Sequence, residues 1–209
     1  GFIEIANAGS STARGQFHAG SVLMAGLRPE DESQTLATTG NIVLRFQNLT
    51  LQGSVIAGGG VTISGPSALL VNGTIRAGTT VNLTGGNSIA VGSAGIIQAA
   101  GAGFVTAASS FTNDGLVSLG GAMRLGGGIE SFTNRNAIAF LATDRFTLPV
   151  SFANTGVIQA SSGIAVTAGT ISNTGLLQSV TGLSLAAQRS SVDPATGLTV
   201  ITRGGLVNT

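Results

Sequence analysis

The side chains that could do chemistry are few in this sequence and stand far apart. Eight acids and one histidine are present, and there is no lysine and no cysteine. Asp114, Glu130 and Asp144 fall in successive repeats, and carboxylates gathered on one face could cleave a polysaccharide, with or without a bound cation. Their positions within the repeat differ, so we expect them at different corners of the molecule. The sequence therefore predicts no catalytic residue.

The remaining candidates for a metal or cofactor site are also isolated. His18 is the single imidazole, and it lies on the polar side of a predicted strand. One imidazole makes neither a catalytic triad nor a metal site. The acids at positions 30–32 lack the ligand spacing of a calcium loop, and the absence of cysteine excludes thiolate chemistry. We predict no metal ion and no cofactor.

The composition favours stacked strands over other classes of protein. Charged residues make up 8% of the chain, hydrophobic residues 43%, and there are 33 glycines. Small and β-branched residues in short runs between turn residues are typical of strands. The nine basic residues are all arginine and are scattered, which argues against a nucleic-acid partner. No apolar run reaches 18 residues, so we expect no membrane-spanning helix.

A repeat of about twenty residues runs through the chain. Asn154-Thr155-Gly156 recurs 19 residues later as Asn173-Thr174-Gly175. An aliphatic residue follows each such turn, then a mostly polar one, then a mostly small one. This alternation predicts a short strand with one buried face, which we name the anchor strand. Its aliphatic residues are Val55, Ile75, Ile97, Val117, Ile138, Ile158 and Leu177.

Two further short strands complete each repeat. The middle strand carries apolar residues two apart, and only the unit at 104–106 fits less well. Its pairs are Val61/Ile63, Val81/Leu83, Met123/Leu125, Phe146/Leu148, Ile164/Val166 and Leu183/Leu185. The corner strand precedes the Asn turn, with Leu70, Phe111, Phe132, Phe152 and Ile171 each two residues before an Asn. Three strands per twenty residues predict an all-β fold, a right-handed parallel β-helix in which equivalent residues stack.

The stacking predicts two structural columns. Asn113, Asn134, Asn154 and Asn173 are spaced by 21, 20 and 19 residues, so they fall at one corner of successive coils. Their amides can hydrogen-bond along the axis as an Asn ladder. We expect Asn to tolerate a left-handed turn there and the following glycine to favour it. Phe111, Phe132 and Phe152 form a parallel Phe ladder.

The whole chain, residues 1–209, is predicted to be one β-helix segment of a longer solenoid. Excursion loops are expected near residues 27–40 and 189–197, where the repeat is interrupted. The last residues, 205–209, read like the approach to another Asn-Thr-Gly corner. We expect a glycine to follow in the parent protein.

The stretches at 154–160, Asn-Thr-Gly-Val-Ile-Gln-Ala, and at 164–169, Ile-Ala-Val-Thr-Ala-Gly, carry a family resemblance. The chain resembles the repeat stalks of filamentous-haemagglutinin-like exoproteins, the two-partner-secretion proteins that include contact-dependent inhibition toxins. This resemblance implies a secreted or cell-surface bacterial protein that is exported through a partner outer-membrane pore. It also implies an adhesive role toward a receptor or glycan on a host or neighbouring cell.

The leading hypothesis is a structural and adhesive stalk without enzymatic activity. A first alternative is a carbohydrate-binding or polysaccharide-degrading β-helix, with a groove bordered by the two excursion loops. A second is an extracellular filament subunit that associates end to end through its terminal coils.

Overall fold

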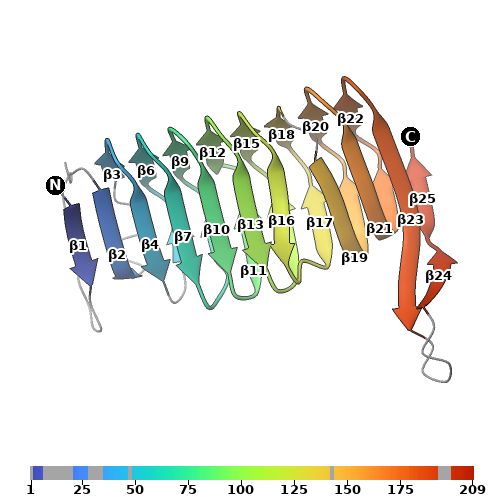
Figure 1. Cartoon of the computed structure of the whole chain (residues 1–209), viewed down its shortest axis with the longest axis horizontal. Coiled ribbons are helices and arrows are strands. Elements are labelled where there is room, and N and C mark those ends of the chain that lie inside the picture. Colours follow the sequence, from blue (N-terminus) through green and yellow to red (C-terminus); the bar gives the residue numbers. More distant parts are fainter. Residues whose placement is uncertain (1, 7–20, 28–34, 47–48, 142–143, 193–198) are drawn as a thin grey trace.

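The protein is a parallel β-solenoid with about three strands in each twenty-residue coil (Figure 1). The computed structural model describes residues 2–6, 21–27, 35–46, 49–141, 144–192 and 199–209. Successive coils stack along one axis, so equivalent strands of neighbouring coils pair side by side. The three kinds of strand predicted from the repeat build three sheets, which we call the anchor, middle and corner sheets.

The anchor sheet has eight described strands, all paired in parallel in chain order. Its strands are β3 (Thr35–Thr38), β6 (Ser54–Ala57), β9 (Thr74–Ala77), β12 (Ile96–Ala99), β15 (Leu116–Leu119), β18 (Ala137–Phe140), β20 (Val157–Ala160) and β22 (Leu176–Ser179).

The middle sheet has seven described strands. They are β1 (Phe2–Ala6), β2 (Ser21–Leu27), β4 (Ile42–Phe46), β7 (Val61–Gly65), β10 (Val81–Gly85), β13 (Gly103–Ala107) and β16 (Met123–Gly127).

The corner sheet has ten described strands. They are β5 (Leu49–Leu51), β8 (Leu69–Val71), β11 (Ser88–Val91), β14 (Ser110–Asn113), β17 (Ser131–Asn134), β19 (Asp144–Asn154), β21 (Ile164–Asn173), β23 (Leu183–Val192), β24 (Thr199–Arg203) and β25 (Gly205–Asn208).

The core is a column of side chains inside the three sheets. Alternate residues of each strand point inward, which is why the period-2 pattern was informative. Ile138, Ile158 and Leu177 are register partners in adjacent anchor strands, and the first two are almost completely buried. The predicted anchor column is therefore confirmed from Val55 to Leu177.

Two details of the predicted register are wrong, and the unit that fitted poorly has a glycine at an inward position. Leu70 points outward, and Leu69 instead stacks on Ile89, because the corner strand here ends in Val71 rather than in Asn72. In the unit that fitted poorly, Phe104 and Thr106 point outward, whereas Gly103 and Val105 are buried. Phe146 pairs with Val166, two residues later than the predicted alignment.

Residues 27–40 do not form one uninterrupted excursion. Thr35–Thr38 is strand β3, and its Leu36 is the register partner of Val55 in the anchor sheet. The sequence pattern missed it because no turn glycine precedes Leu36. The predicted strand that carries His18 and the acids at 30–32 lie outside the described residues.

The middle and corner strands merge in the last coils. β19 and β21 are continuous strands of eleven and ten residues that span both positions, whereas β23 continues from the middle position away from the corner position, which β25 occupies. A β-bulge between Leu148 and Ser151 marks the bend where two strands were separate in earlier coils. The middle sheet ends, among the described strands, at β16.

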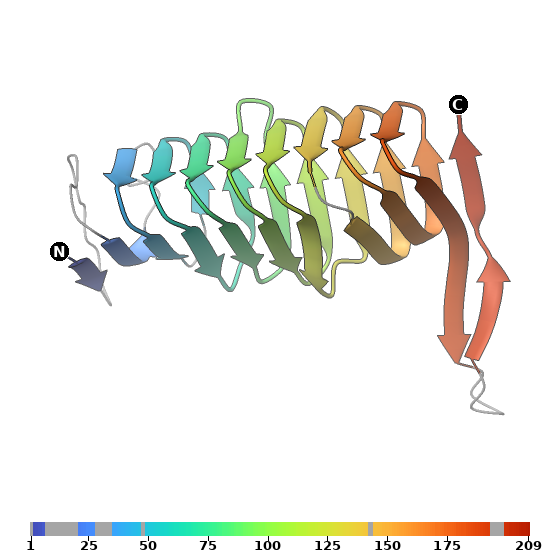
Figure 2. The same cartoon turned by 45° about the horizontal axis from the view of Figure 1, so that its top comes forward.

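The second excursion is a β-hairpin that projects from the end of the rod (Figure 2). Residues 188–192 of β23 pair antiparallel with β24, so the excursion runs somewhat longer than 189–197. The chain then returns as β25, which pairs with β21 and places Asn208 beside Asn173. Insertion of the hairpin therefore leaves the coil register intact.

Candidate functional site

The four predicted asparagines lie one above another inside the solenoid. Each ends a corner strand and is buried, with register partners Asn113–Asn134, Asn134–Asn154 and Asn154–Asn173. The Nδ2 of each donates a hydrogen bond to the Oδ1 of the next, at 2.8, 2.7 and 2.7 Å. A fifth member, Asn208, accepts from Asn173 Nδ2 at 2.7 Å. We name these five residues the amide column.

The amide column also holds the turn backbone. Asn113 Nδ2 lies 3.1 Å from its own coil's Gly115 carbonyl and 3.2 Å from the Ala137 carbonyl of the next coil. Asn134, Asn154 and Asn173 make the equivalent contact within their own turns. Buried carbonyls need such donors, because an unpaired polar group in the core is costly. The side chains thus fasten each turn to itself and to the next coil.

The hydrogen bonds of the amide column all run in one direction along the axis. Each Nδ2 from Asn113 to Asn173 donates to the next coil, so every Oδ1 except that of Asn113 accepts from the coil before it. Asn113 follows Val91, which has no donor, and Asn113 Oδ1 is the buried side-chain atom without a hydrogen-bond partner in the described structure. Leu51, Val71 and Val91 continue the column in the earlier coils as aliphatic residues.

The turn glycines are required for close packing rather than for a left-handed backbone. The φ angles of Gly115, Gly156 and Gly175 lie outside the left-handed region, and the asparagines are the last residues of strands. A Cβ at Gly156 would lie 2.0 Å from the Asn136 carbonyl oxygen, and one at Gly175 would lie 2.1 Å from the Gly156 oxygen. The expected left-handed conformation is therefore wrong for these glycines, and the reason for glycine is the close approach of the neighbouring coil.

The three predicted phenylalanines form a second internal column. Phe111 and Phe132 have ring centroids 5.4 Å apart, and the rings of Phe132 and Phe152 stack nearly parallel with centroids 5.1 Å apart. Phe146 joins them at 5.4 Å from Phe132, and Phe140 meets Phe146 edge to face at 6.1 Å. Such aromatic pairs add stabilisation beyond area burial. We name these five rings the aromatic cluster.

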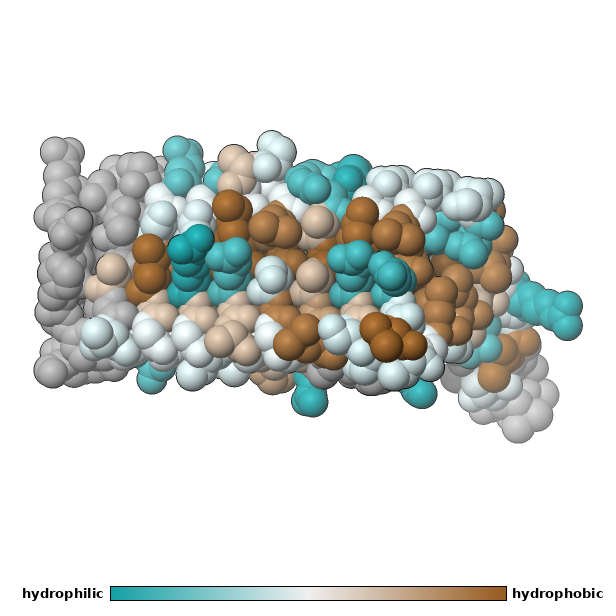
Figure 3. Space-filling view, turned by 90° about the horizontal axis from the view of Figure 1, so that it is seen from above, coloured by the Kyte–Doolittle hydropathy of each residue, from teal (hydrophilic) through white to brown (hydrophobic). Residues whose placement is uncertain are grey.

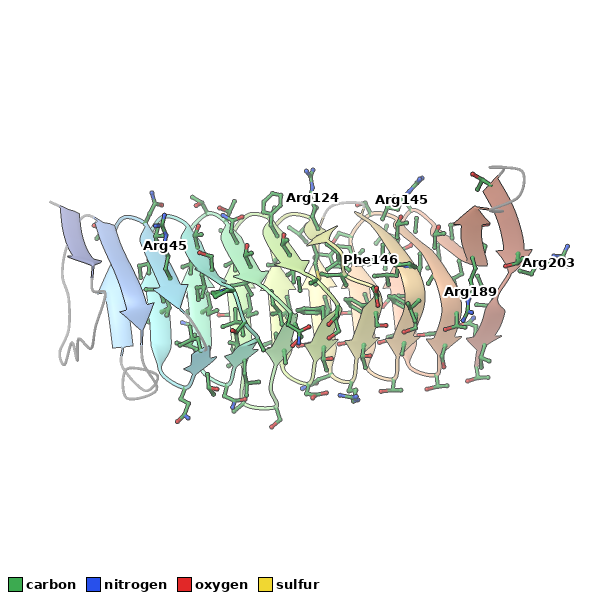
Figure 4. The ribbon with its side chains drawn as sticks, turned by 90° about the horizontal axis from the view of Figure 1, so that it is seen from below. Arg45, Arg124, Arg145, Phe146, Arg189 and Arg203 are labelled. Atoms are coloured by element: carbon green, nitrogen blue, oxygen red, sulfur yellow. The ribbon has the colours of Figure 1, made fainter. Side chains whose placement is uncertain are left out.

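The sequence missed Phe140 and Phe146 as partners of these rings. Phe140 occupies the small-residue position of its anchor strand, where Ala57, Ala77 and Ala160 stand in other coils. Its size could have signalled a partner, because extra volume at one stacked position must be accommodated by its neighbours. Figure 4 shows Phe146 directed into the interior, whereas the labelled Arg124 and Arg145 project outward.

Asp114 and Glu130, the acids whose side chains are described, do not lie together. Asp114 follows β14 and Glu130 precedes β17. Because these two neighbouring strands are parallel, the acids lie at opposite ends of the strands, one after the carboxyl end and one before the amino end. Asp114 instead makes an exposed ion pair of 2.9 Å with Arg135. Asp144 begins β19, and its side chain lies outside the description. No group of three metal-ligating side chains occurs among the described residues.

Figure 3 shows the outer face of the anchor sheet, on which hydrophilic and hydrophobic side chains lie side by side. Gln159 Nε2 donates to Gln178 Oε1 at 3.0 Å along this face. An open hollow of about 300 Å³ beside them is lined by Ser, Gln and apolar residues, none of which is ionisable. Acid–base chemistry therefore has no group to work with in this hollow.

The described strands that flank the two predicted excursions lie far apart along the rod. The strands that flank the first, β2 and β3, belong to the amino-terminal coils, whereas the hairpin of β23 and β24 leaves the last coil (Figure 1). The coils between them fill most of the length of the rod. Residues 28–34 and 193–198, which would border the predicted carbohydrate groove, lie outside the described residues.

The fold and the two internal columns define a class of protein, the parallel β-solenoids, in which the interior is devoted to stacking. Comparison with protein-family models, with curated proteins and with solved structures gave no significant match. Within the described segments, no helix has the length and hydrophobicity needed to cross a bilayer.

Proposed function

We propose that the chain is a structural and adhesive stalk of a secreted or cell-surface bacterial exoprotein, and that it has no enzymatic activity. The observation that carries the proposal is the unbroken interior. Aliphatic, aromatic and amide side chains stack from coil to coil along the described rod, so each coil is held by its neighbours over its whole cross-section.

Such an interior suits a spacer. In a solenoid each coil contacts only its neighbours, and the rod gains roughly 4.8 Å for each added coil. Length can therefore change by whole coils without a change in cross-section. The likeness of residues 154–169 to filamentous-haemagglutinin-like repeats supports a place in a large exported protein, and export would then use a partner pore in the outer membrane.

The spacer role is tested by removing one coil. Deletion of residues 71–90 joins Leu70 to Val91, and Val71 and Val91 are register partners, so the columns are kept. We expect a folded rod whose maximum dimension, measured by small-angle X-ray scattering, is shorter by roughly one strand spacing of 4.8 Å. A control deletion of ten residues breaks the register and should unfold the rod. An unfolded 71–90 deletion would contradict the modular spacer.

The adhesive and non-enzymatic parts need separate measurements. The labelled protein should bind to bacterial or host cells in a saturable manner, and the binding should survive heating below the unfolding transition. Incubation with polysaccharides should release no new reducing or unsaturated ends. Release of such ends would overturn the proposal in favour of a degrading β-helix, and absence of saturable binding on every cell type would remove the adhesive role but keep the spacer.

A further inference from the structure

Three polar side chains lie in a row on the outer face of the anchor sheet, one in each of three successive coils. Arg76, Gln98 and Ser118 are register partners at the third position of β9, β12 and β15, and we name them the polar row. The same outward position holds Ile56 in the coil before the row and Ala139 in the coil after it. The row therefore has two defined ends, with further described coils of the anchor sheet on both sides.

The polar row lines an open hollow of about 380 Å³, together with the small residues Ala77, Ala99 and Ala100. None of the three polar side chains forms a hydrogen bond with another described residue. Further along the same face, by contrast, Gln159 and Gln178 bond to each other. The polar row thus presents its donors and acceptors to whatever occupies the hollow.

The chemistry of the polar row changes from one end to the other. Arg76 is the single ionisable residue that lines the hollow, and no acid lines it, so a negative group is favoured at this end. Its guanidinium is a planar fork of N–H donors that matches a carboxylate. The Gln98 amide and the Ser118 hydroxyl each donate and accept, which suits uncharged hydroxyl groups. The row fits a molecule with a carboxylate at one end and hydroxyls along the rest.

Apolar side chains stand next to the polar row on the same face. Ile96 and Leu116 occupy the outward positions two residues earlier on β12 and β15, and both are half-buried (Figure 3). A sugar ring has C–H faces as well as hydroxyls, so it can contact both kinds of side chain. An extended peptide along the axis fits less well, because its side chains recur on one side about every 6.6–6.8 Å, whereas coils recur about every 4.8 Å.

We propose that the polar row binds a short linear glycan that lies along the rod axis and bears a carboxylate on its terminal ring. Arg76 holds the carboxylate, and Gln98 and Ser118 bond to hydroxyls of the next two rings. Ile96 and Leu116 cover the C–H faces. The inference rests on the adhesive part of the proposed function and names the class of ligand.

The test uses sialyllactose, a trisaccharide with one carboxylate at one end, and its methyl ester, which is uncharged. In an NMR titration of the isotopically labelled protein, we expect sialyllactose to shift the backbone amide signals of residues 76, 98 and 118. The methyl ester should bind about five- to tenfold more weakly, because the charged hydrogen bonds to an exposed guanidinium are lost.

Two variants with the same change of charge show whether the position matters. Arg76→Gln should weaken sialyllactose binding about five- to tenfold and should bind the acid and its ester equally. Arg124→Gln is the matched control, because Arg124 is exposed on the outer face of the middle sheet (Figure 4). This control should keep the affinity of the unaltered protein.

Three results would overturn the inference. Equal affinity of the unaltered protein for sialyllactose and its methyl ester would show that the carboxylate is not recognised. An equal loss in Arg124→Gln would show that only the net charge matters. Signals that shift elsewhere on the rod, or an absence of any shift, would show that the polar row is not a glycan site.

The cell-binding measurement separates this inference from the adhesive role on which it rests. Saturable binding to cells without binding of the trisaccharide would overturn the glycan site and leave the adhesive role standing. Absence of both kinds of binding would overturn both proposals.

Discussion

Val91 stands directly before Asn113 in the corner sheet, and the buried Oδ1 of Asn113 accepts no hydrogen bond from any described residue. The amide column thus begins with an unsatisfied acceptor. A ladder in which every amide donates forward must leave one such atom at its start, unless the preceding residue supplies a donor. This geometry makes the positions along the column unequal, although their sequence context is nearly the same.

Breaking the amide column in its middle should cost more than shortening it. Asn113→Val removes the present orphan acceptor and creates one at Asn134, so the number of orphans stays the same. Asn134→Val leaves orphan acceptors at both Asn113 and Asn154. We expect Asn134→Val to lower the free energy of unfolding by about 1–3 kcal/mol more than Asn113→Val, as measured by urea denaturation. Equal losses of unfolding free energy in the two variants would contradict the proposed direction of the hydrogen bonds along the column.

A donor placed at Val91 should satisfy the orphan. In Val91→Thr the hydroxyl group can donate to Asn113 Oδ1, with little change of shape. Val71→Thr is the matched control, because Val71 is followed in the column by Val91 rather than by an amide. We expect the Val91 variant to be more stable than the control by about 1 kcal/mol or more. A control that is as stable as the Val91 variant would show that the orphan is harmless.

Substitutions at Gly103 and Leu119 should destabilise the protein singly and compensate each other when combined. A Cβ at Gly103 would lie 2.7 Å from Leu119 Cδ1, so the leucine occupies the space that Val81 and Met123 fill in the neighbouring coils. Gly103→Val should overpack the core by about 1–3 kcal/mol, and Leu119→Ala should leave a cavity. The double variant should recover at least about 1 kcal/mol of the summed losses in a double-mutant cycle. Strict additivity would mean that the two sites do not share this space.

Gly204 should be essential for the return of the chain after the hairpin. Its Cβ would lie 1.9 Å from the Gly169 carbonyl oxygen, whereas a Cβ at the adjacent Gly205 would meet nothing within 4 Å. We expect Gly204→Ala to release β25, seen as a loss of hydrogen-exchange protection at residues 205–208, and Gly205→Ala to retain it. If both variants keep their protection, the backbone crossing at Gly204 is not tight.

The repeat predicted the architecture because the same residue types recur at the same position in coil after coil. Val55 through Leu177 recur at one position, and a parallel solenoid is the arrangement that stacks them. The same redundancy located Asn113 through Asn173 and the three phenylalanines. Single coils that depart from the pattern could not be aligned in this way. Leu36 lacks the turn glycine, and Leu70 sits beside an Asn72 that falls one residue beyond the corner position.

Other features could not be predicted, because they depend on contacts between residues at different positions of the repeat. Phe146 contacts Phe132 and Phe140 from a part of β19 whose observed alignment with β21 differs by two residues from the predicted one. Asn208 was recognisable as a corner residue, but 35 residues separate it from Asn173, and only the structure shows that the hairpin is looped out between them. The steric role of the turn glycines likewise required coordinates.

The hairpin leaves the rod after Ala187 and the chain re-enters it at Gly204, with the amide column continuing across the gap. A coil can therefore be opened at this point and closed again without any loss of alignment further along. This seam is a natural graft position: a foreign loop, tag or small folded module inserted in place of the hairpin tip should be displayed beside the shaft while the shaft itself stays whole.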